Sequence, residues 1–220
     1  MQTQTAVLLG ASGLIGSELL QLLLADSYFE EVRALVRRPL EVKDPKLNQI
    51  IVDFSDDDSL KEAIKGDVIF CCLGTTIRNA GSKAAFKLVD REYPLKAARI
   101  GIENGVQIFS IVTALGSDSG SMVFYNKVKG EVEQELKAMR YPSLQIFQPS
   151  LLLGERKEYR SGEEMAKLFM GVFSPLMIGP FKKYRAIQGK TVAKAMLLSA
   201  KESSEQLKVY QSDEIEALVS

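Results

Sequence analysis

The sequence contains no histidine and no tryptophan, and only two cysteines among its 220 residues. The absence of histidine excludes Ser-His-Asp and Cys-His nucleophilic sites and every metal site that uses imidazole. Cys71 and Cys72 are adjacent in an apolar run, which suits neither a disulfide framework nor a zinc site. We therefore expect no bound metal, a reducing compartment, and acid/base chemistry that depends on other side chains.

Long hydrophobic runs and an excess of one charge are also missing. No window reaches the roughly 18 uninterrupted apolar residues of a membrane span, and the N-terminus does not resemble a secretory signal. Lysine plus arginine equals aspartate plus glutamate, at 28 each, so no overall charge attracts nucleic acid or an anionic membrane. These absences predict a cytoplasmic protein that binds neither nucleic acid nor membrane.

Short apolar runs alternate with amphipathic stretches over about the first two thirds of the chain, which is typical of βαβ units. Strands are predicted at 6–9, 32–36, 50–52, 68–72, 106–112 and 144–147. Helices are predicted at 14–24, 58–65, 84–104 with Pro94 as a kink or break, 124–140 and 192–200, and a further extended segment at 207–210. Because the strands are apolar on both faces, we expect one Rossmann-type α/β domain over residues 1–220, with a doubly wound parallel sheet.

The alternation of apolar and amphipathic stretches ends after Leu153. The segment from Leu168 to Phe181 mixes apolar residues with glycine and proline at no clean period. Such a stretch covers a ligand pocket or packs against a partner subunit. We therefore predict that residues 154–190 form a small lid region on the substrate side of the domain.

A glycine-rich loop directly follows the first predicted strand and opens the first predicted helix. Its first glycine permits a tight turn, its second a close approach of the backbone to a pyrophosphate, and its third close packing of helix on strand. The alternative is an ordinary glycine turn, but the flanking strand and helix are the context that dinucleotide binding requires. The predicted cofactor contacts in this loop are Gly10, Ser12, Gly13, Leu14, Ile15 and Gly16.

Two arginines follow the second predicted strand, at the corner where an NAD site would carry a carboxylate. Arg37 and Arg38 could pair with the 2′-phosphate of NADP(H) through charge-assisted hydrogen bonds. The sequence therefore predicts NADP(H) as the cofactor. The alternative is a solvated basic turn.

Further cofactor contacts are predicted where the next two strands end, because ligands of open α/β sheets bind at the carboxyl ends of the strands. Asp53 follows the third strand and could accept a hydrogen bond from the adenine amino group. Capping of the next helix is an equally good role for Asp53. Leu73, Gly74 and Thr75 follow the fourth strand and are expected to lie along the dinucleotide.

Tyr125 and Lys129 are four residues apart, so on a helix both project from one face. Thr113 follows the fifth predicted strand. A phenol beside an ammonium and a positive nicotinamide can act as a general acid/base, so this set predicts carbonyl chemistry without histidine. Thr113 would hold the substrate oxygen, and Tyr125 and Lys129 would also contact the cofactor. The alternative is a half-buried tyrosine beside a surface lysine on an amphipathic helix.

The glycine pattern, Thr113, Tyr125 and Lys129 together resemble the extended or atypical short-chain dehydrogenases/reductases. More narrowly, the segments 71–76 (CCLGTT), 89–93 (VDREY) and 128–133 (VKGEVE) are similar to those of the Tat-interacting oxidoreductase-like proteins. The resemblance runs from about residue 5 to residue 200. It implies a Rossmann fold, NADPH binding, and a catalytic set of serine, tyrosine and lysine.

The chain departs from that family at two places. The serine pair reads Thr113-Ala114, and the Arg-Pro-Gly after the sixth strand reads Gln148-Pro149-Ser150. Threonine keeps the hydroxyl, but the missing arginine removes a charge near the site and puts the inherited substrate preference in doubt. The short region after Leu153 argues against a bulky nucleotide sugar.

Two functions are consistent with these features. The first is an NADPH-dependent reductase of a small carbonyl compound with a Thr113, Tyr125 and Lys129 mechanism. The second is a non-catalytic NADPH-binding regulator or scaffold that acts on a protein partner, because fold alone does not fix function. The long helices of this fold form dimers in the resembling family, so a homodimer is compatible with either.

Overall fold

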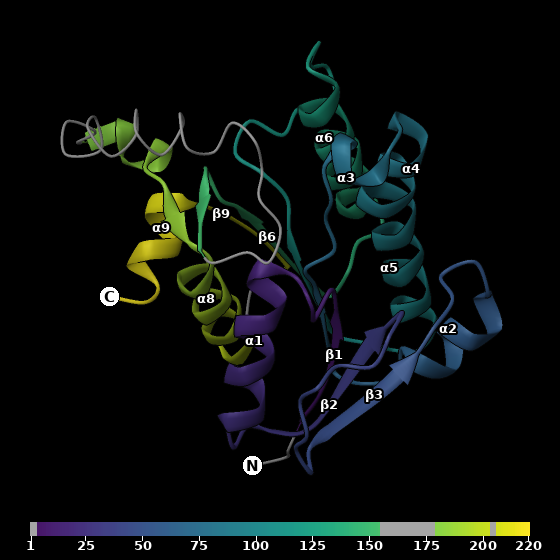
Figure 1. Ribbon diagram of the computed structural model, residues 1–220. Coiled ribbons are helices and arrows are strands. Elements are labelled where there is room, and N and C mark those ends of the chain that lie inside the picture. Colours follow the sequence, from purple (N-terminus) through teal and green to yellow (C-terminus); the bar gives the residue numbers. More distant parts are fainter. Residues whose placement is uncertain (1–3, 155–178, 203–205) are drawn as a thin grey trace.

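The computed structural model describes residues 4–154, 179–202 and 206–220. Within them, seven strands form one sheet in the order β3-β2-β1-β4-β5-β6-β9, and every neighbouring pair is parallel (Figure 1). The strands are β1 (Gln4–Leu9), β2 (Phe29–Val36), β3 (Leu47–Ile51), β4 (Val68–Cys71), β5 (Ile108–Val112), β6 (Ser143–Gln148) and β9 (Leu207–Gln211). The predicted Rossmann-type sheet is confirmed, and the strand order reverses between β1 and β4.

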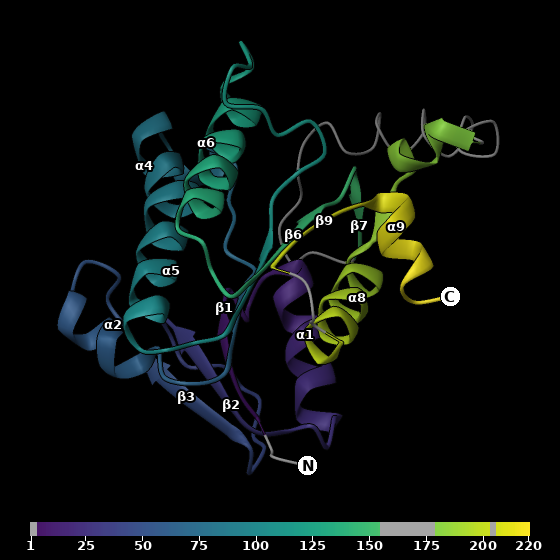
Figure 2. The same ribbon diagram turned by 180° about the vertical axis from the view of Figure 1, so that it is seen from behind.

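Helices cover both faces of this sheet. Two of them, α1 (Leu14–Ala25) and α8 (Gly189–Lys201), pack together on one face, as the views from the front and from behind both show (Figures 1 and 2). The other face carries α2 (Asp57–Ala63), α5 (Tyr93–Glu103) and α6 (Phe124–Ala138). The arrangement is the doubly wound architecture that the apolar strands predicted.

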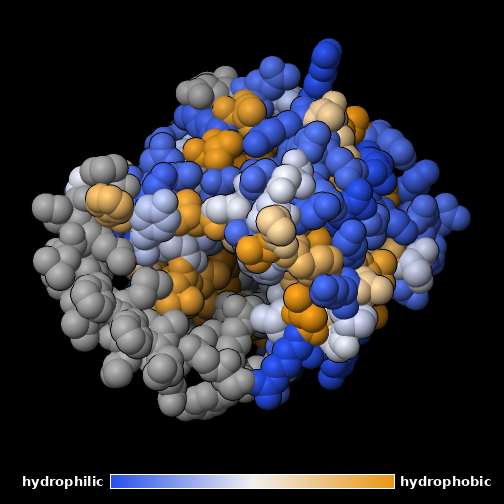
Figure 3. Space-filling model, turned by 90° about the horizontal axis from the view of Figure 1, so that it is seen from above, coloured by the Kyte–Doolittle hydropathy of each residue, from blue (hydrophilic) through white to orange (hydrophobic). Residues whose placement is uncertain are grey.

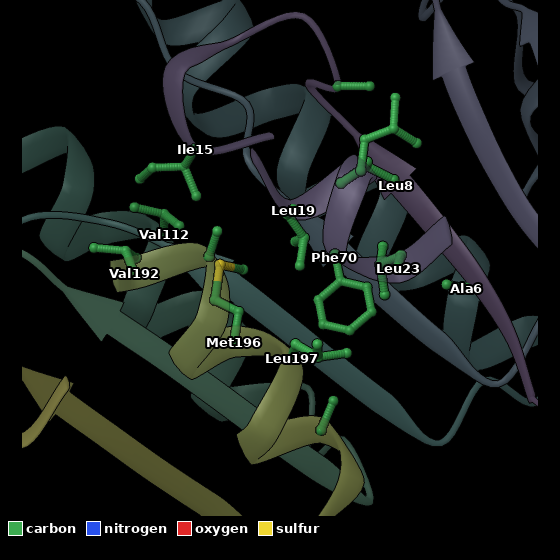
Figure 4. Packing of buried hydrophobic residues seen from close by; sticks show 14 of the residues in the cluster. Ala6, Leu8, Ile15, Leu19, Leu23, Phe70, Val112, Val192, Met196 and Leu197 are labelled. Carbon is green, nitrogen blue, oxygen red and sulfur yellow. The ribbon is translucent and has the colours of Figure 1, made fainter. Parts of the chain in front are cut away.

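The core is divided by the sheet into two clusters. Along β1, Ala6 and Leu8 belong to the cluster under α1 and α8, whereas Val7 and Leu9 belong to the cluster on the other face. All four side chains are fully buried. In the first cluster, Leu19 and Leu23 of α1 and Met196 and Leu197 of α8 surround Phe70 of β4 (Figure 4). A strand segment that alternates between two apolar layers must be apolar at every position, as Ala6 to Leu9 of β1 are.

The long helical segment predicted at 84–104 is three elements in the structure. The short α4 (Lys83–Lys87) passes into a π-helical turn, η1 (Leu88–Glu92), and then into α5. Pro94 is the second residue of α5, and its ring and missing N–H rule out a regular i→i−4 hydrogen bond to Asp90 in η1. The irregular turn is thus placed before the proline and turns Asp90 into the interior, where it is 1% exposed. π-helical turns of this kind are frequent at functional sites.

Several short elements were not predicted. They are α3 (Ile77–Ala80), α9 (Ser212–Ala217), the two-stranded sheet of β7 (Leu152–Leu153) and β8 (Ile187–Gln188), and the 3₁₀ helix η3 (Gly179–Tyr184). The apolar segment 168–181 and the predicted lid 154–190 fall largely on residues 155–178, which lie outside the described part of the chain. The division into a Rossmann domain and a lid therefore stays a prediction. Among the described helices, none has the length and hydropathy needed to cross a membrane.

Candidate functional site

The loop between β1 and α1 requires glycine at two positions. Gly10 has a φ of +84°, and a Cβ atom there would lie 2.5 Å from the carbonyl oxygen of Cys72, the residue directly after the neighbouring strand β4. A Cβ atom on Gly16 would lie 2.1 Å from the carbonyl oxygen of Gly10. Side chains at either position would separate α1 from the sheet. The first and third glycines therefore set the turn and the close packing of the helix.

The middle glycine is in more open surroundings. The N–H of Gly13 donates to the carbonyl of Gly10 over 2.9 Å, and the nearest atom to a Cβ built on Gly13 is that same oxygen, 3.3 Å away. Gly13 also caps α1 without any side-chain hydrogen bond, and the first turn of the helix contains no acidic residue. The N–H groups of this turn and the positive end of the helix dipole fit the pyrophosphate of a dinucleotide.

The side chains of Ser12, Leu14 and Ile15, the other predicted contacts of this loop, point in different directions. Ser12 is exposed, whereas Ile15 is only 6% exposed and packs in the core under α1. The side chain of Leu14 lies against Gly189, the first residue of α8, and against Gly154, where a Cβ atom would approach it within 2.5 Å. Ile15 is therefore left with only its backbone N–H to offer a ligand.

The carboxyl ends of β2 and β3 present charged side chains to solvent. Arg37 and Arg38 are both exposed directly after β2, as a site for a 2′-phosphate requires. Asp53 is also exposed and accepts hydrogen bonds from the N–H and hydroxyl of Ser55, which hold the pKa of Asp53 below its usual value. The cap of α2 is Asp56, so the structure does not use Asp53 as the helix cap.

The loop after β4 is tied to the interior by Asp90. The N–H of Thr75 donates to the carboxylate of Asp90 over 2.8 Å. A Cβ atom on Gly74 would lie 3.6 Å from Asp90 and 4.0 Å from the ammonium of Lys129. Leu73 is partly buried beside them. The predicted cofactor loop and the predicted catalytic lysine are thus joined through Asp90, whose carboxylate meets both.

Lys129 and Asp90 form a buried ion pair. The Lys129 ammonium lies 2.8 Å from the Asp90 carboxylate, and the residues are 5% and 1% exposed. Burial works to lower the pKa of Lys129, but the neighbouring Asp90 and Tyr125 outweigh it, so this pKa lies above its usual value. Lys129 is therefore a fixed, charged hydrogen-bond donor at the carboxyl end of the sheet.

Tyr125 lies one turn earlier on α6 and reaches the surface. Its side chain belongs to a residue that is 36% exposed, and its ring packs against Phe86 with centroids 5.7 Å apart. It projects from the same helical face as Lys129, because the two are four residues apart. The structure therefore places a partly exposed tyrosine one helical turn from a buried ammonium.

Thr113 lies directly after β5 and is only 5% exposed. Its hydroxyl donates to the carboxylate of Glu133 on α6 over 2.7 Å. Glu133 also accepts from the side-chain amide of Gln148, at 2.9 Å from each oxygen. The hydroxyl predicted to hold the substrate oxygen is thus engaged with a buried carboxylate.

Sequence reasoning missed Asp90, Glu133 and the role of Gln148 as its partner. A signal for Glu133 was present, since it follows Lys129 by four residues and Tyr125 by eight, on one helical face. Asp90 carried no comparable signal, because a π-helical turn changes the face on which a residue lies.

The remaining candidate chemistry is limited. Burial raises the pKa of the Cys71 thiol to about 12, so this thiol does not act as a nucleophile. Among the described residues, no group of three or more Cys, Asp or Glu side chains could hold a metal ion.

Figure 3 looks onto the end of the molecule that is uppermost in Figure 1, where the strands have their carboxyl ends, and shows a hollow with hydrophobic side chains on its wall. A separate cavity of about 300 Å³ lies at the opposite end of the sheet. It is lined by Lys137, Arg140, Tyr141, Leu144, Gln206 and Leu207. Because β6 and β9 begin there, this cavity is distant from the glycine loop and plays no part in the site.

Comparison with known proteins agrees with this geometry. Residues 10–145, which contain the glycine loop, Tyr125 and Lys129, match a family model described as NAD(P)H-binding. The chain belongs to this NAD(P)H-binding family. Protein HTATIP2 of Rattus norvegicus is 37% identical over 201 residues, which cover 90% of this chain and 81% of that relative. The narrower resemblance drawn from segments 71–76, 89–93 and 128–133 is therefore confirmed.

Among solved structures, the fold is similar to that of the Bordetella bronchiseptica enzyme WbmH in complex with NAD⁺. The TM-score is 0.74 and the identity 14%, over 96% of this chain and 76% of that one. A likeness at this identity concerns the fold alone, which is a Rossmann-like α/β fold.

The expected cytoplasmic location is wrong, because several relatives of this chain are named as mitochondrial proteins. The Debaryomyces hansenii protein FMP52, named mitochondrial, is 30% identical over 202 residues, covering 90% of this chain and 88% of the relative. Further fungal relatives carry the same designation. The expectation rested on the lack of a secretory signal and of a membrane span, and neither feature bears on import into mitochondria.

Proposed function

We propose that the protein is an NADPH-dependent reductase of a small carbonyl compound. The observation that carries this proposal is the accessible phenol of Tyr125, one helical turn from the buried ammonium of Lys129. That ammonium adjoins Gly74, in the loop where an open α/β sheet receives its dinucleotide. A proton donor beside the nicotinamide end of such a site is the arrangement that carbonyl reduction needs.

The residues present fit a dinucleotide. Gly10, Gly13 and the uncapped start of α1 would hold the pyrophosphate, and Gly74 and Thr75 would lie along the cofactor beyond it. Lys129 would donate to the nicotinamide ribose while Asp90 keeps its ammonium in place. A nicotinamide bound in this site would supply the hydride that reduction of a carbonyl carbon requires.

Tyr125 supplies the proton. As the carbon–oxygen double bond becomes a single bond, the phenol O–H transfers its proton to the substrate oxygen, which leaves an alcohol and a phenolate. The phenolate then takes a proton from water, because the side chain is in contact with solvent. Lys129 favours the transient phenolate by its positive charge, although Asp90 offsets part of this effect.

The preference for NADPH over NADH belongs to the same proposal. Arg37 and Arg38 are exposed at the end of β2, and no described carboxylate is paired with either of them. Guanidinium groups at this position favour a 2′-phosphate. The NAD(P)H-binding family by itself does not distinguish NADPH from NADH, so the preference rests on these two arginines.

The test is a panel of small aldehydes and ketones with NADPH, followed by NADPH consumption. We expect turnover by the wild type and a loss of about 100-fold or more in Tyr125→Phe. Tyr93→Phe removes a phenol that stacks on Phe54 and is the matched control. Equal rates in Tyr125→Phe and wild type would contradict the assignment. Tight NADPH binding without any turnover would favour the alternative, a cofactor-binding regulator whose ligand is a protein partner.

A further inference from the structure

Glu133 is a buried carboxylate for which the proposed reaction has no role. It is 3% exposed and lies one turn beyond Lys129, on the face of α6 that meets the ends of β5 and β6. Its surroundings supply donors from three residues. Thr113 lies at 2.7 Å, Gln148 at 2.9 Å from both oxygens, and the ammonium of Lys137 at 3.5 Å. Because the amide NH₂ of Gln148 and the ammonium of Lys137 can only donate, the carboxylate of Glu133 is the acceptor toward both.

This arrangement decides where the proton of Thr113 goes. A hydroxyl group has one proton and two lone pairs, and an ionised carboxylate can only accept. The Thr113 proton is therefore donated to Glu133. The next nearest acceptor, the carbonyl of Phe147 at 3.4 Å, is also within the protein. Thr113 has only lone pairs left for any other molecule.

We propose that Glu133 is a positioning residue that makes Thr113 a hydrogen-bond acceptor toward the bound substrate. The inference rests on the proposed function, which puts the substrate between Thr113 and Tyr125. A carbonyl oxygen also only accepts, so it gains nothing from Thr113, and Tyr125 is its proton donor. The lone pairs of Thr113 instead select a substrate that carries a hydroxyl or N–H group next to its carbonyl, and they bind the hydroxyl of the alcohol product.

The test uses two probes that differ in a single donor. The affinities of 2,2,2-trifluoroethanol and its methyl ether for the protein with saturating NADP⁺ are measured by ¹⁹F NMR. We expect the alcohol to bind about three- to ten-fold more tightly than the ether, the gain of one ordinary hydrogen bond. Thr113→Val should remove most of this preference, and Thr113→Ser should restore it. A wild type that prefers the ether, or a preference that survives in Thr113→Val, would overturn the inference.

A second variant separates Glu133 from Thr113. Glu133→Met combined with Gln148→Met removes the acceptor without leaving the buried amide unpaired, and thermal unfolding confirms that it folds. The freed hydroxyl of Thr113 can then donate, so the ether should gain affinity and the alcohol-to-ether ratio should fall towards one. An unchanged ratio, or failure of both probes to bind the cofactor complex, would contradict the role of Glu133. A protein that shows the probe preference but reduces no carbonyl would contradict the reductase and leave this inference standing.

Discussion

The carboxylate of Asp90 and the ammonium of Lys129 are 2.8 Å apart, at a place where Asp90 is 1% and Lys129 5% exposed. The π-helical turn η1 brings Asp90 inward, and its second oxygen accepts from the N–H of Thr75. One carboxylate thus joins the loop after β4 to α6. Because the pair is neutral as a whole, Lys129 acts mainly by a hydrogen bond from a fixed position.

Asp90→Asn should destabilise the protein strongly. The amide can still accept from Thr75, but the buried ammonium of Lys129 loses its counter-charge, which costs about 3 kcal/mol or more. Urea unfolding measures the loss. Glu103→Gln, which breaks the exposed pair with Lys61, is the control and should leave the midpoint nearly unchanged. Similar small losses in both variants would show that the Asp90–Lys129 pair contributes little.

Alanine at Gly13 and at Gly10 should have different effects. A Cβ atom on Gly13 would meet the carbonyl oxygen of Gly10 at 3.3 Å and that of Cys72 at 4.0 Å, whereas one on Gly10 would lie 2.5 Å from the carbonyl oxygen of Cys72, with φ at +84°. Gly13→Ala should therefore keep most of its stability and lose cofactor affinity, because the methyl group occupies the approach to the pyrophosphate. Gly10→Ala should lose stability as well. Calorimetric NADPH titration and thermal unfolding separate these outcomes, and unchanged affinity in Gly13→Ala would argue against this loop as the cofactor site.

Arg37→Ala should weaken NADPH binding by about ten-fold or more and leave NADH binding almost unchanged. A charge-assisted hydrogen bond to the 2′-phosphate contributes about 1.5 to 3 kcal/mol, and NADH lacks this group. Fluorescence titration of both nucleotides measures the ratio. Arg99→Ala, which removes an exposed arginine of α5 paired with Glu135, is the control. If the wild type binds both nucleotides equally, Arg37 and Arg38 are a solvated turn.

Asp26→Asn should lower stability at neutral pH but not in acid. Burial works to raise the pKa of Asp26, yet hydrogen bonds from Lys201 and Tyr28 outweigh it, so this pKa lies below its usual value in the folded state. The stabilisation is therefore present above the unfolded-state pKa and is lost as pH falls through the folded-state value. The free energies of unfolding of the two proteins, about 1 kcal/mol apart at pH 7, should converge as the pH falls below the folded-state pKa of Asp26. A difference that persists there would assign it to something other than the charge.

The centre of the sheet was predictable because its strands β1, β4, β5 and β6 are largely buried on both faces. In β1, Ala6 to Leu9 are all apolar and alternate between the two core clusters. A continuous apolar run of this kind indicates a parallel strand with helices on both faces. The break in helix 84–104 was expected from Pro94, but the helix departs from regular geometry earlier, at Leu88 to Glu92. A proline disturbs the turn before it, since it cannot bond to the carbonyl four residues earlier, here that of Asp90, but it does not determine that this turn is π-helical or that Asp90 faces the interior.

The site was predictable where its residues are close together in the sequence. Gly10, Gly13 and Gly16, and likewise Tyr125 and Lys129, are close in sequence, so strand and helix periods place them. The partners of Lys129 and Thr113 come from elements far along the chain, 39 residues away for Asp90 and 20 for Glu133. Such pairings depend on how helices pack on the sheet, which composition and period do not determine.

The most direct test of the proposed reductase is hydride transfer itself. The protein is incubated with NADPH carrying deuterium at C4, separately labelled on each face, and the panel of small carbonyl compounds, and the alcohols are analysed by mass spectrometry. The account predicts deuterium on the carbinol carbon from one of the two labelled faces, and at least a hundred-fold less product with Tyr125→Phe. Absence of deuterated alcohol from every compound, in a wild type shown to bind NADPH, would contradict it.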